Sequence, residues 1–152
     1  MQPRMKNPAM ILSETLPSLL AVGQTARNAG VPTKTCYLMY LRASQINGCG
    51  FCVDMHSREL RDIGETQERL ASVAAWRHTP YFTDAERAAL ALTEATTLVA
   101  GVSDPVPDEV WNEAAEHYNE KELAALVLNI SLINFWNRMN IPTGAMAGTP
   151  VK

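Results

Sequence analysis

Two cysteines and one histidine are the residues whose types and spacing most favour chemistry in this chain. Cys49 and Cys52 form a Cys-x-x-Cys pair, and His56 follows Cys52 by four residues. On an α-helix, spacings of three and four residues place side chains on one face, so we expect these three to lie together. Gly48 precedes the pair, which predicts that Cys49 lies in the first turn of a helix. There the free N–H groups and the helix dipole stabilise a thiolate.

This combination predicts thiol redox chemistry. A thiolate attacks peroxides and disulfides, and a second thiol one turn away captures the oxidised sulfur as a disulfide before it over-oxidises. His56 can take up a proton or pair with the thiolate. The cluster therefore contains an attacking thiol, a resolving thiol and a base.

A zinc site is one alternative interpretation of the Cys-x-x-Cys pair. The chain has no second such pair, and His78 and His117 are far away in sequence. We therefore expect no metal site, since a structural zinc ion usually takes four ligands. We also expect both histidines to be surface residues or to be satisfied by hydrogen bonds.

The two cysteines could instead be inert core residues, since free cysteine packs well in protein interiors. The polar neighbours Asn47, Asp54 and Ser57 argue against their full burial. His56 could be a structural histidine, although its position one helical turn after the cysteine pair argues against that role. Cys36 has no partner nearby in sequence, and we expect it to be a small core residue.

Composition and charge limit the classes of protein that this chain can represent. The 152 residues fit one domain, 1–152, with 47% hydrophobic and 19% charged residues. The charged fraction is below the usual quarter, which indicates that some apolar surface is buried between subunits. The net charge of −3 and the absence of a basic run predict that nucleic acid is not a partner.

Hydropathy and cysteine usage point to a protein of the cytoplasm. No stretch reaches 18 uninterrupted apolar residues, so we expect no membrane span. The apolar run near the N-terminus is interrupted by polar residues and Pro17, unlike a signal peptide. Three cysteines, two of them in a Cys-x-x-Cys pair, suit a reducing compartment better than a disulfide framework.

Helix signals occur along the whole chain, and clear strand signals are absent, so the predicted fold class is all-α with about six to seven helices. Thr83 with Glu86 and Asn119 with Glu122 have the spacing of capping boxes. Pro142 is expected to end the last helix. The predicted helices cover residues 17–28, 33–47, 49–63, 67–76, 84–100, a segment from 107, and 120–139.

The last helix predicts an oligomer. Its segment LAALVLNISLINFW is apolar on nearly every face, which is typical of a helix that is buried all round. A subunit of six or seven helices covers one side of such a helix well. We therefore expect a second chain to cover the remaining face in a closed, symmetric homo-oligomer.

Three segments of the chain resemble the carboxymuconolactone decarboxylase and alkylhydroperoxidase D-like (AhpD-like) family. They are LRASQINGCGFCVDMHSREL at residues 41–60, FTDAERAALALTEA at 82–95 and INFWNR at 133–138. The resemblance spans roughly residues 15–140 and implies an AhpD-like helical bundle that assembles into trimers or hexamers. In peroxidase members it implies that Cys52 attacks the peroxide, Cys49 resolves the oxidised sulfur, and His56 belongs to a proton relay.

The chain departs from the peroxidase pattern at two places. Peroxidase members place a glutamate twelve residues before the first cysteine, and Tyr37 occupies that position here. A phenol with a pKa near 10 is a poor base at neutral pH. The best-known peroxidase members also carry a histidine between the cysteines, where this chain has Gly50 and Phe51. Fewer proton carriers predict slower or different chemistry.

The leading hypothesis is a thiol-dependent peroxidase or thiol–disulfide oxidoreductase with Cys49, Cys52, His56 and Tyr37 at its site. We expect a hydroperoxide substrate, no bound cofactor, and a dithiol reductant that is either lipoylated or thioredoxin-like. A second hypothesis is a non-catalytic redox sensor or interaction protein that uses the same disulfide as a switch. A third is a lyase on a small lactone acid, although the decarboxylase branch of the family works without the cysteine pair.

Overall fold

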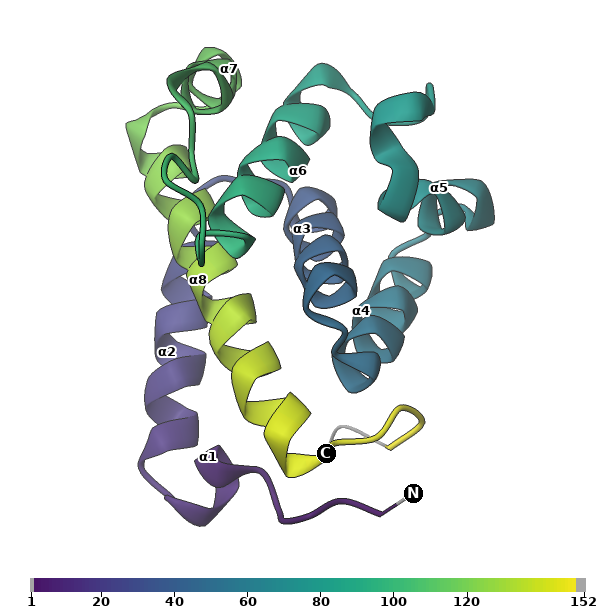
Figure 1. Cartoon of the computed structure of the whole chain (residues 1–152), viewed down its shortest axis with the longest axis vertical. Coiled ribbons are helices and arrows are strands. Elements are labelled where there is room, and N and C mark those ends of the chain that lie inside the picture. The colour runs from purple at the N-terminus through teal and green to yellow at the C-terminus, as the bar shows by residue number, and fades with distance from the viewer. Residues whose placement is uncertain (1, 150–152) are drawn as a thin grey trace.

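The computed structural model describes residues 2–149, and all regular secondary structure in this part of the chain is helical (Figure 1). The predicted all-α fold class is confirmed. Residues 2–149 form eight α-helices and one 3-10 helix, where about six to seven helices were expected. The helices are α1 Pro8–Ile11, α2 Thr15–Arg27, α3 Thr33–Asn47, α4 Gly50–Asp62, α5 Gln67–Ser72, the 3-10 helix η1 Val73–His78, α6 Asp84–Thr97, α7 Asp108–His117 and α8 Glu120–Thr143.

Both predicted capping boxes are present. The Thr83 hydroxyl accepts from the Glu86 N–H at 3.2 Å, and the Glu86 carboxylate accepts from the Thr83 N–H at 2.9 Å. Asn119 and Glu122 form the same reciprocal pair at the start of α8. Each box satisfies two backbone donors that would otherwise lack partners, which explains why these two helix starts were predicted correctly.

Several helix bounds differ from the prediction, and α6 ends at Thr97 rather than at residue 100. The segment expected as one helix over 67–76 divides into α5, which ends at Ser72, and η1, which begins at Val73 and has a kink at Ala75 (φ −125°, ψ 28°). Pro142 does not end α8 but lies inside its last turn, and the helix continues to Thr143. Gly144 ends the helix with φ 71°, a left-handed conformation that glycine adopts at low cost.

Helix α3 forms the centre of the molecule, where it packs against α4, α6 and α8 (Figure 1). One group of buried apolar side chains lies between α3, α6 and α8, and includes Met39, Leu92 and Ile130. A second group joins α3 to α4 and η1 through Leu41 and Leu60. Burial of each large apolar side chain stabilises the fold by about 1.5–3 kcal/mol. The second group therefore holds α4, which carries the cysteine pair, against α3, while the first group holds α6 and α8 against α3.

A carboxylate on α6 connects α3 and η1 to the same core. Glu94 accepts hydrogen bonds from Arg42 Nε at 2.6 Å and Trp76 Nε1 at 2.9 Å, and it also pairs with Arg77. Burial alone would raise the pKa of this carboxyl, but the hydrogen bonds from its three partners outweigh burial and hold the pKa below its usual value.

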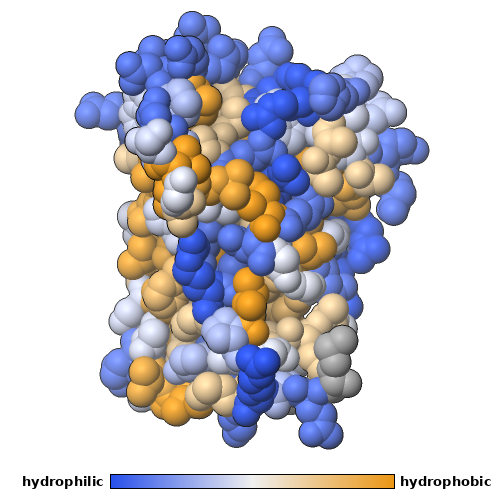
Figure 2. All heavy atoms as spheres, viewed as in Figure 1, coloured by the Kyte–Doolittle hydropathy of each residue, from blue (hydrophilic) through white to orange (hydrophobic). Residues whose placement is uncertain are grey.

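Helix α8 is only partly covered by its own chain. Leu126 and Ile130 are fully buried, whereas Val127 is 36% exposed and Phe135 is 42% exposed. In the view of Figure 2, apolar patches are exposed on the side of the molecule that faces the reader, while the upper end is mainly hydrophilic. One side of α8 thus faces the core, and another side presents large apolar groups to solvent. In the part of the chain that the structure describes, no helix is both long and apolar enough to cross a bilayer.

Candidate thiol redox site

The cysteine pair lies at the start of α4, immediately after a tight reversal of the chain. Gly48 ends α3 in the left-handed conformation (φ 72°), and the Cys49 N–H donates to the Ser44 carbonyl at 3.0 Å. Cys49 is the N-cap of α4, and its Sγ accepts from the Cys52 N–H at 3.4 Å. The two sulfur atoms lie at disulfide-bonding distance, with Cα atoms 5.3 Å apart. The helix start thus brings the two thiols together.

Both cysteines are buried, contrary to the expectation drawn from their polar neighbours. Cys49 is 2% exposed and Cys52 is 0% exposed. The neighbours point elsewhere: Asn47 turns toward α8, and Asp54 pairs with Arg58 on the outer surface. Successive positions on a helix point in different directions, so polar neighbours in sequence do not expose the residue between them.

Asparagines of α8 hold the turn that carries the pair. The Asn47 side-chain amide donates to Asn134 Oδ1 at 2.9 Å and to Asn137 Oδ1 at 2.8 Å. Asn137 in turn donates to the Ser44 hydroxyl at 3.1 Å. Asn134 and Asn137 belong to the INFWNR segment, and Asn47 belongs to the INGC segment. The two motifs are therefore parts of one buried hydrogen-bonded network, which fixes the end of α3 where α4 begins.

Asn140 contacts the sulfur of Cys52 directly. Its Nδ2 lies 3.5 Å from Cys52 Sγ, and its Oδ1 accepts from Asn7 Nδ2 at 3.0 Å. Because the amide oxygen is occupied by Asn7, the amide N–H faces the sulfur. A donor in this position stabilises a thiolate more than a thiol. This contact was not predicted, since 88 residues separate Asn140 from Cys52.

His56 is buried one turn after Cys52, at 5% exposure. Its Nδ1 lies 2.6 Å from Glu59 Oε2, and its ring lies 5.2 Å from the Tyr40 ring, centroid to centroid. Tyr40 in turn donates to Asn129 Oδ1, and burial raises the pKa of the Tyr40 phenol. His56 Nε2 is buried and has no hydrogen-bond partner among residues 2–149. The ring therefore has one nitrogen held by a carboxylate and one that is free.

Tyr37 lies beside this group rather than within it. Its ring packs against Tyr40 with centroids 6.0 Å apart, and Tyr40 is the tyrosine whose ring packs against His56. Burial raises the pKa of Tyr37, and the nearby Glu59 carboxylate raises it further. Tyr37 is thus a weaker acid than a free phenol and faces a negative charge on α4. Neither Glu59 nor Tyr40 was predicted as a site residue from the sequence, although Glu59 follows His56 at helical spacing.

The remaining cysteine and histidines lie apart from the pair. Cys36 is buried, and burial raises its pKa to about 11, which makes it an inert thiol at neutral pH. His78 is exposed, and His117 is exposed with its Nε2 3.7 Å from Glu113. Within residues 2–149, no group of three or more His, Cys, Asp or Glu side chains is arranged to hold a metal ion.

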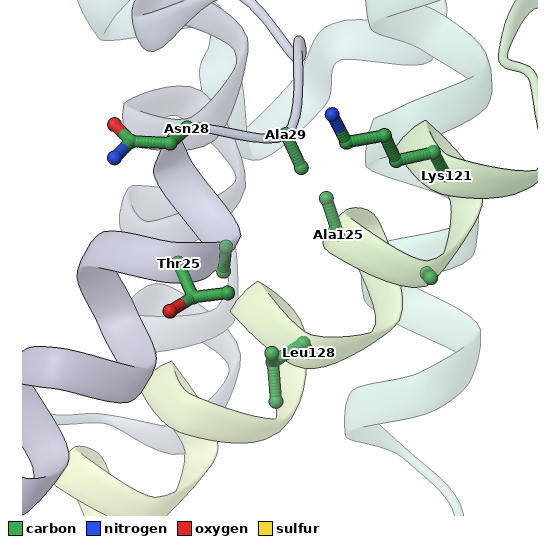
Figure 3. A pocket seen from close by; sticks show the side chains of 8 residues that line it. Thr25, Asn28, Ala29, Lys121, Ala125 and Leu128 are labelled. Atoms are coloured by element: carbon green, nitrogen blue, oxygen red, sulfur yellow. The ribbon is translucent and has the colours of Figure 1, made fainter.

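Two of the hollows on the surface of residues 2–149 differ in their relation to the site. One of about 230 Å³ lies on the outer face of α4, and its lining includes Phe51, Met55 and Glu59. A larger one of about 480 Å³ lies between the end of α2 and the start of α8, with Thr25 and Asn28 on one side and Lys121 and Leu128 on the other (Figure 3). Only the smaller hollow includes a residue that contacts the site, namely Glu59.

Comparison with known proteins agrees with the fold and with the cysteine motif. The profile of the carboxymuconolactone decarboxylase family matches residues 14–95. The uncharacterised protein YdfG of Bacillus subtilis is 37% identical over 139 residues, which cover 91% of this chain and 93% of that protein. The chain therefore belongs to the carboxymuconolactone decarboxylase family.

Further comparisons place the chain in the AhpD-like group of this family. A crystal structure from Agrobacterium tumefaciens, of a protein of unknown function named as a candidate antioxidant defence protein AhpD, has a TM-score of 0.88. It is 31% identical, and the match covers 99% of this chain and all of that one. An alkyl hydroperoxide reductase AhpD of Methylocella silvestris is 44% identical over 55 residues, which cover 36% of this chain and 30% of that protein. The AhpD-like fold predicted from the sequence is confirmed.

Proposed function

We propose that this protein is a thiol-dependent hydroperoxide reductase whose redox centre is the Cys49–Cys52 pair. The observation that supports the proposal most is the position of two joined sulfur atoms at the start of α4, with a buried histidine one turn away on the same helix. The local match to alkyl hydroperoxide reductases adds to it, because that match is to named members of the peroxidase branch.

The proposed cycle begins at Cys52, whose sulfur faces the Asn140 amide N–H. His56 Nε2 takes the Cys52 thiol proton, and the thiolate attacks one peroxide oxygen. The O–O bond breaks, the alkoxide leaves with the proton as an alcohol, and Cys52 becomes a sulfenic acid. The Cys49 sulfur then attacks Cys52, a water molecule leaves, and the disulfide forms. One hydroperoxide is thereby reduced to one alcohol and one water, and two thiols are oxidised.

A dithiol must return the pair to its reduced form through thiol–disulfide exchange. Because Cys49 and Cys52 are both buried, the proposal favours a slender dithiol, such as a lipoyl group, over the broad surface of a thioredoxin-like protein. The same burial favours small hydroperoxides as substrates.

The deciding experiment is a multiple-turnover assay of hydroperoxide consumption with dihydrolipoamide as reductant. We expect many moles of peroxide to be consumed per mole of protein, and we expect Cys52→Ser to abolish turnover. The Cys49→Ser variant should accumulate sulfenic acid at Cys52 instead of the disulfide. The Cys36→Ser variant is the matched control and should retain turnover.

Two other outcomes of this assay would contradict the proposal. Stoichiometric disulfide formation without turnover would favour a redox sensor that uses the disulfide as a switch. Decarboxylation of a small lactone acid that survives loss of both cysteines would favour the lyase that the family's name describes.

A further inference from the structure

Glu59 is the carboxylate that holds the buried histidine of the site. We propose that Glu59 is a positioning residue that fixes the tautomer of His56 and so completes a Cys52–His56–Glu59 relay on one face of α4. This inference rests on the proposed function, because it assigns the residue that prepares the base for the thiol. The three residues are spaced by four and three positions along α4. On a helix these spacings stack the side chains on one face.

The contact between Glu59 and His56 determines which ring nitrogen carries the proton. Glu59 Oε2 lies 2.6 Å from His56 Nδ1. An ionised carboxylate can only accept hydrogen bonds, so the neutral ring must carry its proton on Nδ1. Nε2 is then the basic nitrogen, and it is the atom that is buried without a partner among residues 2–149. The carboxylate thus leaves a free lone pair available for the thiol proton.

No other carboxylate within the described residues lies at ion-pair distance from His56. The facing helix α3 presents two phenols instead, Tyr40 against the ring and Tyr37 near the carboxylate. Burial raises the pKa of both phenols, so they are neutral at neutral pH. Glu59 therefore supplies the negative charge that stabilises the imidazolium formed when His56 takes a proton, as the acidic member of a nucleophile–base–acid triad does.

The exposure of the pair differs from that of an ordinary surface ion pair. The His56 side chain is 7% exposed, whereas the Glu59 side chain is 36% exposed and lines the 230 Å³ hollow on the outer face of α4. Surface pairs contribute little because water competes for both partners. Here water reaches only the carboxylate, so Glu59 connects solvent with a ring that solvent barely reaches.

The first test is direct observation of the tautomer by long-range ¹H–¹⁵N NMR of the reduced protein. The chain has only three histidines, so His56 can be assigned by comparison with His56→Ala. We expect the Nδ1–H tautomer for His56 in the wild type and its loss or mixing in Glu59→Gln. A wild-type His56 that carries its proton on Nε2 would overturn the proposal. This measurement needs no peroxide, so it stands apart from the test of the proposed function.

The second test is a double-mutant cycle on the rate of disulfide formation between Cys49 and Cys52. The oxidant is hydrogen peroxide in one arm and oxidised dithiothreitol in the other. We expect Glu59→Gln to slow the reaction by about tenfold or more, and Glu59→Asp to recover part of the rate. In the His56→Ala background, Glu59→Gln should change the rate less than about twofold, because its action passes through His56.

Asp62→Asn is the matched control, because it removes the same charge from the same helix and the same hollow. It should leave the rate unchanged. If Glu59→Gln lowers the rate of disulfide formation by the same factor in the wild-type and His56→Ala backgrounds, Glu59 has a general electrostatic role and the relay is refuted. If hydrogen peroxide fails to oxidise the pair but oxidised dithiothreitol gives the expected rates for all four variants, the peroxidase function is rejected and the relay is retained.

Discussion

At the scale of single residues, the acidic partner of His56 lies on the helix of the cysteines rather than on the facing helix. The resemblance to peroxidases predicts a carboxylate at position 37, where this chain has Tyr37 on α3. The structure instead places the Glu59 carboxylate on His56 and near Tyr37. Two carboxylates at such close positions would repel each other. A phenol at position 37 is therefore compatible with a glutamate at position 59.

This arrangement predicts that the carboxylate can be moved from one helix to the other. Tyr37→Glu in the wild-type background should give little gain in peroxide reduction, because Glu59 already occupies the site. The same substitution in the Glu59→Gln background should recover at least about one third of the rate lost. The measurement is the initial rate of thiol loss after addition of peroxide, with Tyr37→Gln in the same background as control. Equal rates for these two double variants would contradict the prediction.

Residue-level features could be predicted only where they are close in sequence. Cys49, Cys52 and His56 lie within about two helical turns, so their spacing alone predicts that they share one face of α4. Asn140 contacts Cys52 across 88 residues of chain, and Asn134 and Asn137 bind Asn47 across similar distances. The sequence marks them only through their spacing of three along the last helix and, for Asn134 and Asn137, through the INFWNR segment that resembles the family. That pattern indicates buried polar groups but does not identify their partners.

At the scale of helices, local signals predicted the starts better than the ends. Capping boxes are complete within four residues, so Thr83 and Asn119 marked their helices correctly. Pro142 was expected to end α8, but a proline in the last turn removes only one hydrogen bond at a place where the helix is ending anyway. The kink at Ala75 lies next to Trp76, a member of the buried group that joins α3, α4 and η1, and no local pattern predicted it.

The hydrogen bonds of Glu94, which join α6 to α3 and η1, should make the stability of the fold depend on pH. Because the pKa of Glu94 is lowered in the fold, its contribution to stability is present above about pH 4.5 and is lost as the pH falls through the folded-state value. Glu94→Gln should reduce the free energy of unfolding at pH 7 by about 1.5–3 kcal/mol, the typical value of a hydrogen bond to a charged group.

Urea unfolding at a series of pH values between 7 and 2 checks this prediction. The difference in free energy of unfolding between wild type and Glu94→Gln should hold down to about pH 4.5 and shrink below it, while the exposed control Glu68→Gln should show little difference from wild type throughout. A difference that stays constant over this range would show that the charge of Glu94 is not the source of the effect.

At the scale of the whole molecule, the uncovered side of α8 predicts self-association. Phe135 is 42% exposed and Val127 is 36% exposed on a helix whose opposite side is fully buried. Light scattering behind a sizing column should give a mass that is three or six times the 16.7 kDa of one chain at micromolar concentration. Phe135→Asp should lower that mass, because burial of a charge at an apolar contact is costly.

The matched control for this substitution is Tyr81→Asp, which places the same charge at a similarly exposed aromatic residue outside α8. It should leave the assembly unchanged. A wild-type mass near that of one chain would contradict the prediction, and an unchanged mass for Phe135→Asp would place the contact elsewhere on the surface.

The placement of the proposed nucleophile, base and acid on one helix also affects how such a site can be inherited. Cys49, Cys52, His56 and Glu59 lie within the single stretch 49–59, so one short exchange of genetic material could carry the whole relay into another helical protein. The Asn140 donor lies on α8 and would not be transferred with that stretch. A recipient would therefore gain the order of the groups but not the hydrogen bond to the sulfur. Reactivity in transplanted versions should depend on whether the new scaffold presents an amide donor at that position.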